Sequence, residues 1–241
     1  MKNFNRFLCS FLIVGLFGLL FTCACKHNTP GTAISPTGND VGMTVIALPP
    51  PQKTIGKPLM QVLNERKTTR KFSDQDLPIQ ELSNLLWAGF GINRPEKGYR
   101  TAPSAVNWQV IDIYVALKSG VYIYNAKNHA LLPVLAGDVR NQAVHPLQPL
   151  RGSVLKAPVI LLYIADGKKR SILEKAMSLE ERAMYENCDA GFISENVYLY
   201  CASQGLATVV RGMVDRPLLA AKMNLRPEQR ILLSQTVGYR K

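Results

Sequence analysis

The sequence lacks the residue spacings that side-chain catalysis and metal binding require. None of its three histidines, His27, His129 and His145, stands at metal-ligand spacing with a cysteine or a carboxylate. His27 and His129 fall in segments of loop composition, where we expect solvated side chains. No nucleophile-elbow motif surrounds Ser104, and glycine-rich phosphate loops are missing. We therefore expect no metal site and no catalytic side chain, so the protein either binds a ligand or uses a cofactor for its chemistry.

Acidic residues are scarce, with 17 Asp and Glu against 29 Lys and Arg, which gives a formal net charge of +12. An excess of this size indicates an anionic partner, and nucleic acid, anionic lipid and a phosphate-bearing cofactor are the candidates. The cations are dispersed and are not interleaved with aromatic residues, so we expect no nucleic-acid binding. With 47% hydrophobic residues the chain is not globally disordered, and a mean hydropathy of zero argues against a polytopic membrane protein.

Cysteines are too few for a disulfide framework in a chain of 241 residues, and three of the five lie in the first 25 positions. Lys2 and Arg6 precede an apolar run over residues 7–21, which is typical of a secretory signal peptide and shorter than a membrane-spanning helix needs. A small residue then precedes Cys25, which resembles the cleavage box of bacterial lipoproteins. We expect a signal peptide over residues 1–24 and a lipid on Cys25, with Cys23 as the competing acceptor and an uncleaved anchor as the alternative.

This N-terminus predicts a protein of the bacterial cell envelope, held to the membrane by a lipid anchor on its periplasmic face. Residues 25–57 are rich in Pro, Gly, Thr and Asn and follow no helical or strand period, so we expect a linker there. The folded domain is expected over residues 58–241. Its two cysteines, Cys188 and Cys201, are expected to be buried small hydrophobic residues rather than a redox pair.

Hydrophobic periodicity divides the rest of the chain into helices and strands. We expect helices over residues 59–65, 78–89, 179–204 and 217–223, the third of them broken near Asp189–Gly191. Strands are expected over residues 110–117, 121–124, 130–135, 158–164 and 231–237. The continuous apolar run 158–164 is typical of a strand buried on both faces. This alternation predicts an α+β fold with one central sheet.

Three segments carry polar groups that a hydrophobic core does not require. Arg66, Lys67 and Thr68 place two cations beside a hydroxyl, which suits a phosphate or a polyhydroxy chain, with a solvated basic loop as the alternative. Asn107 and Gln109 offer amide donors and acceptors that suit the edge of a heteroaromatic ring, with a capping loop as the alternative. The third segment has two parts, which are residues 205–212 and the chain terminus 238–241.

Residues 66–72 read Arg-Lys-Thr-Thr-Arg-Lys-Phe, and residues 103–109 read Pro-Ser-Ala-Val-Asn-Trp-Gln. The first resembles Arg-Arg-Ser-x-Arg-x-Phe and the second resembles Pro-Ser-x-x-Asn-x-Gln, two motifs of the nitroreductase family. Lys67 and Thr68 stand where that family has Arg and Ser, which keeps the charge and the hydroxyl but loses the planar fork of arginine.

Two later segments extend the resemblance to the nitroreductase family. Residues 196–212 are similar to its second flavin-contacting loop, and residues 238–241 are similar to its Gly-Tyr-Pro-Lys, with Arg240 in place of proline. The run 100–105 and the hairpin that begins at Gly120 most resemble the branch that contains the azoline-forming peptide dehydrogenases. Each motif is weak alone, whereas their order and spacing together span residues 59–241.

The resemblance implies a mixed central sheet flanked by helices, an intertwined homodimer, and FMN bound at the subunit interface. The basic segment and the chain terminus would hold the phosphate and the ribityl chain, the second segment would line the flavin from the partner subunit, and the third would approach its redox edge. The implied cofactor-binding residues are Arg66, Lys67, Thr68, Arg70, Pro103, Ser104, Ala105, Asn107, Gln109, Val210, Arg211, Gly212, Arg240 and Lys241.

The resemblance also implies an FMN-dependent oxidoreductase that transfers hydride through the flavin N5 position in a ping-pong reaction. NAD(P)H or another donor would supply the electrons, and a nitroaromatic, a quinone or another small organic molecule would be the substrate. A cation at Arg211 beside the ring would raise the flavin potential. Two alternatives stay open: a lipid-tethered flavin- or ligand-binding protein with this fold and no turnover, and a basic lipoprotein that docks to anionic envelope polymers without a flavin.

Overall fold

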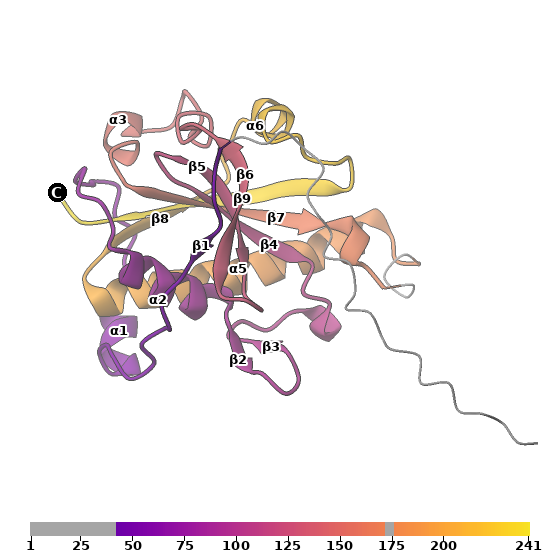
Figure 1. Ribbon diagram of the computed structural model, residues 1–241, viewed down its shortest axis with the longest axis horizontal. Coiled ribbons are helices and arrows are strands. Elements are labelled where there is room, and N and C mark those ends of the chain that lie inside the picture. Colours follow the sequence, from indigo (N-terminus) through magenta and orange to yellow (C-terminus); the bar gives the residue numbers. More distant parts are fainter. Residues whose placement is uncertain (1–41, 172–175) are drawn as a thin grey trace, which may run out of the picture. The chain divides into compact units, whose positions relative to one another are not determined.

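Seven strands form the central sheet of the computed structural model, which describes residues 42–171 and 176–241 (Figure 1). Their spatial order is β1, β6, β5, β4, β7, β9 and β8. The strands are β1 Ile46–Ala47, β4 Ile111–Ala116, β5 Gly120–Asn125, β6 Ala130–Ala136, β7 Val159–Asp166, β8 Ala207–Arg211 and β9 Gln229–Gly238. Two further short strands, β2 Ile92–Arg94 and β3 Tyr99–Arg100, pair with each other as a separate hairpin.

Every pairing between neighbouring strands of the described sheet is antiparallel. The expected mixed sheet is therefore not found in this part of the chain, although the α+β class is confirmed. The chain crosses from β7 to β8 through a long helix, so these two strands run in the same direction, as the alternation of helices and strands favours. Because β9 lies between β7 and β8, each of them pairs antiparallel with β9 instead of parallel with the other.

β7 occupies an interior position in the sheet, and all eight of its residues are buried. Alternate side chains enter two different hydrophobic clusters, with Leu161 and Tyr163 on one face and Leu162 and Ile164 on the other. The strand expected from the apolar run 158–164 is thus confirmed. The core therefore consists of two layers, one on each face of the sheet.

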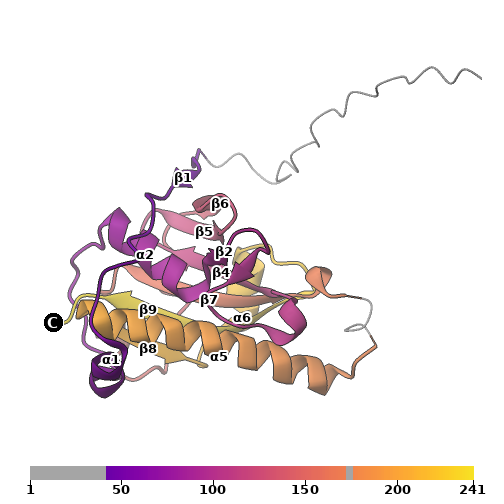
Figure 2. The same cartoon turned by 90° about the horizontal axis from the view of Figure 1, so that it is seen from below.

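Helices cover the two faces unequally. One face carries α2 Ile79–Phe90 and α5 Leu179–Gln204, which pack against each other and against the sheet (Figure 2). The other face is covered by α6 Arg216–Lys222 and by the segment 137–157, which contains α3 Arg151–Val154. A further helix, α1 Leu59–Glu65, packs against α5. The helices expected near these positions are confirmed.

α5 is continuous over 26 residues, so the expected break near Asp189–Gly191 is wrong. A capping box between Ser178 and Glu181 begins the helix, and Gly205 ends it in the left-handed conformation. Asp189 is buried and accepts the Ala105 N–H at 3.0 Å, so it does not compete for the backbone of its own helix. Gly191 lies on the exposed side, where one glycine costs a helix only about 1 kcal/mol. Of the two cysteines in this helix Cys201 is buried as expected, whereas the expected burial of Cys188 is wrong, because Cys188 lies on the same exposed side.

Residues 43–57 belong to the folded domain, although their composition predicts a linker. β1 pairs with β6, and Leu48 is buried in the core layer beneath α2. The Gln52 N–H donates to Asn84 Oδ1 at 2.8 Å, and the Lys57 N–H donates to Ser203 Oγ at 2.9 Å. The expected domain start at Pro58 is therefore wrong, because main-chain hydrogen bonds and one buried leucine tie this segment down and composition does not record them.

His129 is partly buried and hydrogen-bonded instead of solvated. Its Nε2 lies 2.7 Å from Ser83 Oγ and 3.1 Å from the Pro49 carbonyl oxygen, and its Nδ1 lies 3.0 Å from the Tyr124 hydroxyl. Burial lowers the pKa of His129 below its ordinary value, while the bond to Pro49 opposes that shift. The expectation of a solvated histidine fails because the N-terminal segment folds back over the β5–β6 hairpin.

The expected signal peptide 1–24, the lipidation candidates Cys23 and Cys25, and the linker up to residue 41 lie outside the described residues. Within residues 42–171 and 176–241, no helix has the length and apolar character needed to cross a membrane. The same ranges contain no group of three or more side chains of the types that hold a metal ion.

Candidate functional site

The basic segment 66–71 runs along the free edge of β8, the last strand of the sheet. The Thr69 N–H donates to the Thr208 carbonyl oxygen at 2.9 Å, which holds the main chain of the segment against the strand. Arg66 follows the last residue of α1, and its guanidinium carbon lies 5.5 Å from the centre of the Tyr198 ring. The segment therefore presents its side chains beside the edge of the sheet. Its exposed residues include Lys67, Thr68 and Arg70.

Tyr198, near the C-terminal end of α5, joins the basic segment to β8. Its hydroxyl lies 3.0 Å from Thr68 Oγ1 and accepts the Val210 N–H at 3.1 Å. The Tyr198 residue is only 6% exposed. One buried hydroxyl therefore contacts two of the segments that the sequence assigns to cofactor binding.

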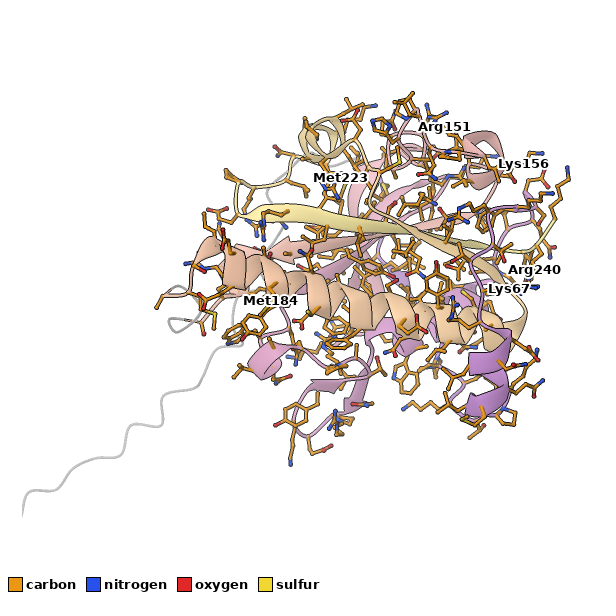
Figure 3. All side chains as sticks on the ribbon, turned by 180° about the vertical axis from the view of Figure 1, so that it is seen from behind. Lys67, Arg151, Lys156, Met184, Met223 and Arg240 are labelled. Carbon is orange, nitrogen blue, oxygen red and sulfur yellow. The ribbon has the colours of Figure 1, made fainter. Side chains whose placement is uncertain are left out.

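The chain terminus lies next to the same segment. Phe72 forms an isolated antiparallel bridge with Arg240, and the Lys241 N–H donates to the Lys71 carbonyl oxygen at 3.4 Å. Figure 3, which views the molecule from behind, shows Lys67 and Arg240 at the same end of the molecule. In the described part of the chain no ion pair neutralises the cations gathered here, which are Arg66, Lys67, Arg70, Arg240 and Lys241.

Arg211, the last residue of β8, is buried, with 5% of its surface exposed. Among the described residues its Nε, Nη1 and Nη2 atoms find no hydrogen-bond partner. Burial lowers the pKa of Arg211 to about 10, Tyr198 raises it, and the cation of Arg70 lowers it. The paired Ser234 on β9 shares this face, and its Oγ also lacks a partner in these residues. Because an unpaired buried cation is unfavourable, this arrangement favours the approach of an anion or of several acceptors.

We call the group formed by the basic segment, the end of β8 and the chain terminus the cationic site. Its members are Arg66, Lys67, Thr68, Arg70, Val210, Arg211, Gly212, Arg240 and Lys241. The structure thus places nine of the residues implied by the sequence at one edge of the sheet.

Residues 103–109, which we call the amide loop, have an unusual backbone. Val106, Asn107 and Gln109 adopt φ angles of 46°, 57° and 51°, in the left-handed region that non-glycine residues rarely enter. Asparagine tolerates this region, whereas a β-branched residue such as Val106 is strained there. Val106 is also 78% exposed, so burial of its side chain within this chain does not offset the strain.

Side chains hold the amide loop in this shape. The Gln109 N–H donates to Ser104 Oγ at 3.1 Å, and Gln109 Nε2 donates to Asn107 Oδ1 at 2.8 Å. Arg100 Nε donates to Gln109 Oε1 at 2.7 Å, and Asp189 of α5 accepts the Ala105 N–H. The amide groups expected to contact a ring are therefore engaged with one another. The structure brings Pro103, Ser104, Ala105, Asn107 and Gln109 together in this loop.

The amide loop contacts α5 near its middle, whereas the cationic site contacts it toward its C-terminal end. The loop contacts this helix at Asp189 and the cationic site contacts it at Tyr198, nine positions later, which is about 14 Å along the helix axis. One chain therefore assembles each group separately and does not bring the two together.

The family model described as the nitroreductase family matches residues 63–239, a range that includes the amide loop and most of the cationic site. The chain belongs to the nitroreductase family. Membership implies a flavin-dependent oxidoreductase, and members of the family typically bind FMN.

Individual members of the nitroreductase family are similar to this chain over most of its length. A protein of Methanocaldococcus jannaschii that is named as a nitroreductase is 29% identical over 161 residues, 64% of this chain and 78% of that protein. The crystal structure of a protein of Ralstonia eutropha JMP134, described as a nitroreductase, has a TM-score of 0.74 and 40% identity, covering 83% of this chain and 91% of that one.

The microcin synthetase McbBCD complex of E. coli, solved with truncated pro-MccB17 bound, is similar in fold. It has a TM-score of 0.62 and 18% identity, and the match covers 79% of this chain and 77% of that chain. At this identity the likeness shows a common fold and does not carry activity or substrate over.

The cationic site of this nitroreductase family member fits FMN by the chemistry of its donors. A phosphate needs cations and hydroxyl donors, which Arg66, Thr68 and Arg240 supply without competing ion pairs in the described residues. The orphaned guanidinium of Arg211 needs acceptors, which the phosphate and ring oxygens of FMN can provide.

The sequence motifs do not include two residues that contact these groups, Tyr198 and Asp189. Asp189, Ile193 and Val197 are spaced by four residues and share the buried face of α5, so a carboxylate stands on an apolar stripe. A charged residue at such a position is a detectable signal, because isolated carboxylates are rarely buried. Tyr198 carries no comparable signal, since a tyrosine at the border of an apolar stripe is ordinary.

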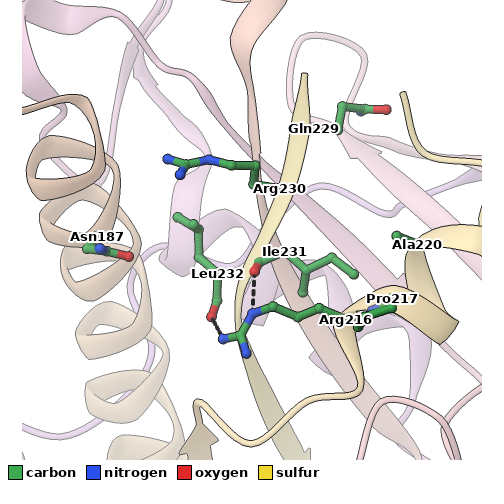
Figure 4. A pocket seen from close by; sticks show the side chains of 8 residues that line it. All are labelled: Asn187, Arg216, Pro217, Ala220, Gln229, Arg230, Ile231 and Leu232. Carbon is green, nitrogen blue, oxygen red and sulfur yellow. Dashed lines mark hydrogen bonds between the residues drawn. The ribbon is translucent and has the colours of Figure 1, made fainter. Parts of the chain in front are cut away.

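A pocket of about 450 Å³ lies elsewhere in this nitroreductase family member, between α5, α6 and the start of β9 (Figure 4). Arg216 donates to the carbonyl oxygens of Ile231 and Leu232 at 2.8 Å and 2.7 Å, where β9 extends past the end of β8. The arginine thus blocks an open strand edge. No residue of the cationic site or the amide loop lines this pocket, so the pocket is separate from both groups of candidate residues.

Proposed function

We propose that this nitroreductase family member is an FMN-dependent oxidoreductase that works as an intertwined homodimer on a small organic substrate. The observation that carries the proposal is the buried guanidinium of Arg211, which has no hydrogen-bond partner in the described residues and adjoins a basic segment whose cations form no ion pair there. A protein keeps such a group at a cost in stability, and a bound anionic ligand offsets that cost.

The basic segment and the chain terminus would hold the FMN phosphate and ribityl chain. Arg66, Lys67 and Thr68 offer two cations and a hydroxyl on one side, and Arg240 and Lys241 offer two cations on the other. Charge-assisted hydrogen bonds of this kind are about twice as strong as neutral ones. Part of the net charge of +12 thereby acquires a function.

The end of β8 would hold the edge of the flavin ring. Thr208 and Val210 direct backbone groups away from β9, and these are bound by Thr69 and Tyr198. Gly212 continues this row one step past the last paired residue and is exposed. Its backbone and the Arg211 guanidinium are therefore the groups that we assign to the ring.

A second copy of the chain would supply the amide loop to each site. Within one chain this loop is about 14 Å along α5 from the cationic site, as measured by their helix contacts. The outward face of α5 carries Met184, Cys188, Gly191 and Phe192 at three- and four-residue spacing, all exposed. A Cβ on Gly191 would meet no atom of the described residues within 4 Å, so this part of the chain does not require glycine there. An apolar stripe with a glycine suits close packing against a second helix.

A bound FMN supplies reversible uptake and release of a hydride equivalent, which no side chain of this protein provides. The residues of the chain bind and orient: the cationic site anchors the phosphate, and Arg211 places a positive charge beside the ring. We propose that donor and acceptor occupy the same position in turn, in a ping-pong reaction without a protein nucleophile or general base.

The substrate in this proposal is a nitroaromatic, a quinone or another small organic molecule, and NAD(P)H or another reductant is the donor. The motif 100–105 favours the azoline-forming peptide dehydrogenase branch, in which the flavin oxidises its substrate. We also propose that the protein is anchored by a lipid on Cys25 at the periplasmic face of a bacterial envelope. NAD(P)H is scarce there, so that location favours a different donor.

Purification of the full chain without added flavin tests the proposal. We expect a yellow protein whose visible absorbance bleaches on addition of NADPH, or of dithionite if NADPH is not its donor, and returns with menadione or nitrofurazone. A bound flavin whose absorbance changes with neither a physiological donor nor an acceptor would indicate the alternative, a tethered binding protein without turnover. A colourless protein that also ignores added FMN would falsify the proposal. Mass spectrometry of the mature N-terminus tests the lipid on Cys25.

A further inference from the structure

The Tyr198 hydroxyl has its hydrogen bonds in a defined direction. The Val210 N–H can only donate, so at 3.1 Å the tyrosine oxygen accepts from it. Thr68 Oγ1 lies 3.0 Å from the same oxygen, and in the described residues no other acceptor lies within hydrogen-bond distance of the Tyr198 proton. The Tyr198 hydroxyl therefore donates its hydrogen bond to Thr68 Oγ1.

This assignment determines what Thr68 can do. Its oxygen accepts from Tyr198, so its own proton is directed away from the protein, and Thr68 is exposed. The hydroxyl next to two cations is thereby held as a donor toward an external anion. Chains of aligned hydrogen bonds polarise one another, which strengthens the last donor in the row.

Two further contacts hold Tyr198 in place for this role. Its side chain is buried between α5 and the edge of β8, and the Arg66 guanidinium lies over its ring. Arg66, which is assigned to the phosphate, thus also restrains the Tyr198 ring. The backbone of Val210, the hydroxyl of Tyr198 and the hydroxyl of Thr68 form one continuous row.

We infer that Tyr198 is a positioning residue, which aligns the Thr68 hydroxyl as a hydrogen-bond donor to the phosphate of the bound flavin. The inference rests on the proposed function, since it concerns the same site. It assigns Tyr198 a role in selecting a phosphorylated flavin over an unphosphorylated one. The row also links the phosphate end of the site to β8, which carries the ring-binding backbone.

The test compares FMN with riboflavin, which has the same ring and no phosphate. Affinities for the full chain, after removal of bound flavin, are measured by quenching of flavin fluorescence. Tyr198→Phe removes the hydroxyl that donates to Thr68 Oγ1, so Thr68 is no longer held as a donor to the phosphate. We expect about tenfold weaker FMN binding. Riboflavin binding should be nearly unchanged, so the preference for FMN falls by about the same factor.

Two more variants complete the experiment. Thr68→Val interrupts the same row, so it should reduce the FMN preference as Tyr198→Phe does, and the double variant should lose little more than either single one. Tyr200→Phe is the matched control, because Tyr200 lies on the same helix and donates to Glu81 Oε1 at 2.5 Å, outside the site. It should leave both affinities unchanged.

Several results would overturn the inference. Unchanged FMN affinity in Tyr198→Phe, or equal losses for FMN and riboflavin, would show that Tyr198 supports the fold alone. If Tyr198→Phe fails to fold, Thr68→Val tests the inference instead, since the Thr68 side chain is exposed and its replacement should not prevent folding. An unaltered FMN preference in Thr68→Val would exclude a contribution of this hydrogen-bonded row to phosphate binding. Wild-type protein that binds neither flavin would overturn the proposed function as well, which separates the two failures.

Discussion

The cationic site and the amide loop are built in opposite ways. In the cationic site the donors outnumber the acceptors, and the buried guanidinium of Arg211 has no partner among the described residues. In the amide loop the donors and acceptors satisfy one another, with Gln109 bonded to Ser104, Asn107 and Arg100. In the cationic site unsatisfied polar groups lower the stability of the folded chain, whereas in the amide loop backbone strain at Val106 does so.

This difference indicates two kinds of function. Unsatisfied buried donors are stabilised when a ligand arrives, so the cationic site is expected to gain most from binding. A self-satisfied but strained loop is already in its final shape, which suits a surface that is presented to another molecule. We therefore expect ligand binding to depend on the first region and assembly to depend on the second.

The largest expected effect is at Arg211. Arg211→Leu removes a buried cation that has no partner in the part of the chain that the structure describes. We therefore expect FMN affinity to fall about 100-fold while the free apoprotein becomes more stable. Thermal unfolding with and without FMN measures both changes. Arg216→Ala is the control: it removes an exposed arginine that bonds two carbonyls of β9, so FMN affinity should stay constant. A less stable Arg211→Leu apoprotein would show that the guanidinium is satisfied within the chain.

The bound flavin reports on the same substitution. In any Arg211→Leu protein that retains FMN, the midpoint potential is expected to fall by roughly 30 mV, which is a tenfold change in the preference for the reduced form. A potential that does not fall would contradict a position of this cation beside the ring.

The second prediction concerns assembly. Gly191→Lys places a long cation on the outward face of α5, where the described residues leave open space. We expect sedimentation to show a monomer and FMN binding to weaken, because the amide loop of a second copy no longer reaches the site. Gly191→Ala is the milder comparison. A monomeric wild-type protein, or a Gly191→Lys dimer with full affinity, would refute this surface.

The third prediction concerns strain in the amide loop. Val106→Asn replaces a β-branched residue at a φ of 46° by one that tolerates the left-handed region. We expect the free energy of unfolding of the monomer to rise by about 1 kcal/mol. Urea denaturation measures it, and a loss of stability would mean that the Val106 side chain contributes packing. FMN and riboflavin preference, which depends on the cationic site, should not change.

The smallest expected effect is a pH dependence of stability that involves neither region, because neither the cationic site nor the amide loop contains a histidine. Burial lowers the pKa of His129, so the unfolded chain binds more protons than the folded one as the pH falls toward 5. Stability should therefore decrease between pH 7.5 and 5.5. His129→Gln should flatten this slope in thermal unfolding, and an unchanged slope would assign it to other groups.

Some of the fold follows from local patterns. The apolar run 158–164 predicts β7 because a strand buried on both faces needs no alternation, and the three- and four-residue spacing over 179–204 predicts α5. Asp189 and Gly191 suggest a break in α5 because the sequence does not show which group the Asp189 carboxylate binds. The bond from the Ala105 N–H, eighty-four positions away in sequence, removes the reason for that break.

Other features depend on contacts between distant residues. The composition of residues 43–57 predicts a linker, yet pairing of β1 with β6 makes the segment part of the sheet. The antiparallel placement of β9 between β7 and β8 likewise has no local signature. Tyr198 enters the site through two hydrogen bonds to segments that periodicity cannot relate to it.

The amino-acid sequence by itself determined the family and the kinds of donor that the protein offers to a ligand. Motif order and side-chain chemistry are properties of the chain, and they hold in any conformation. The tertiary structure alone decided which of these donors meet. The edge of β8 gathers the cationic site, whereas the length of α5 keeps the amide loop away from it. Burial at that edge leaves Arg211 without a partner among residues 42–171 and 176–241, because the sheet there excludes water and supplies no anion.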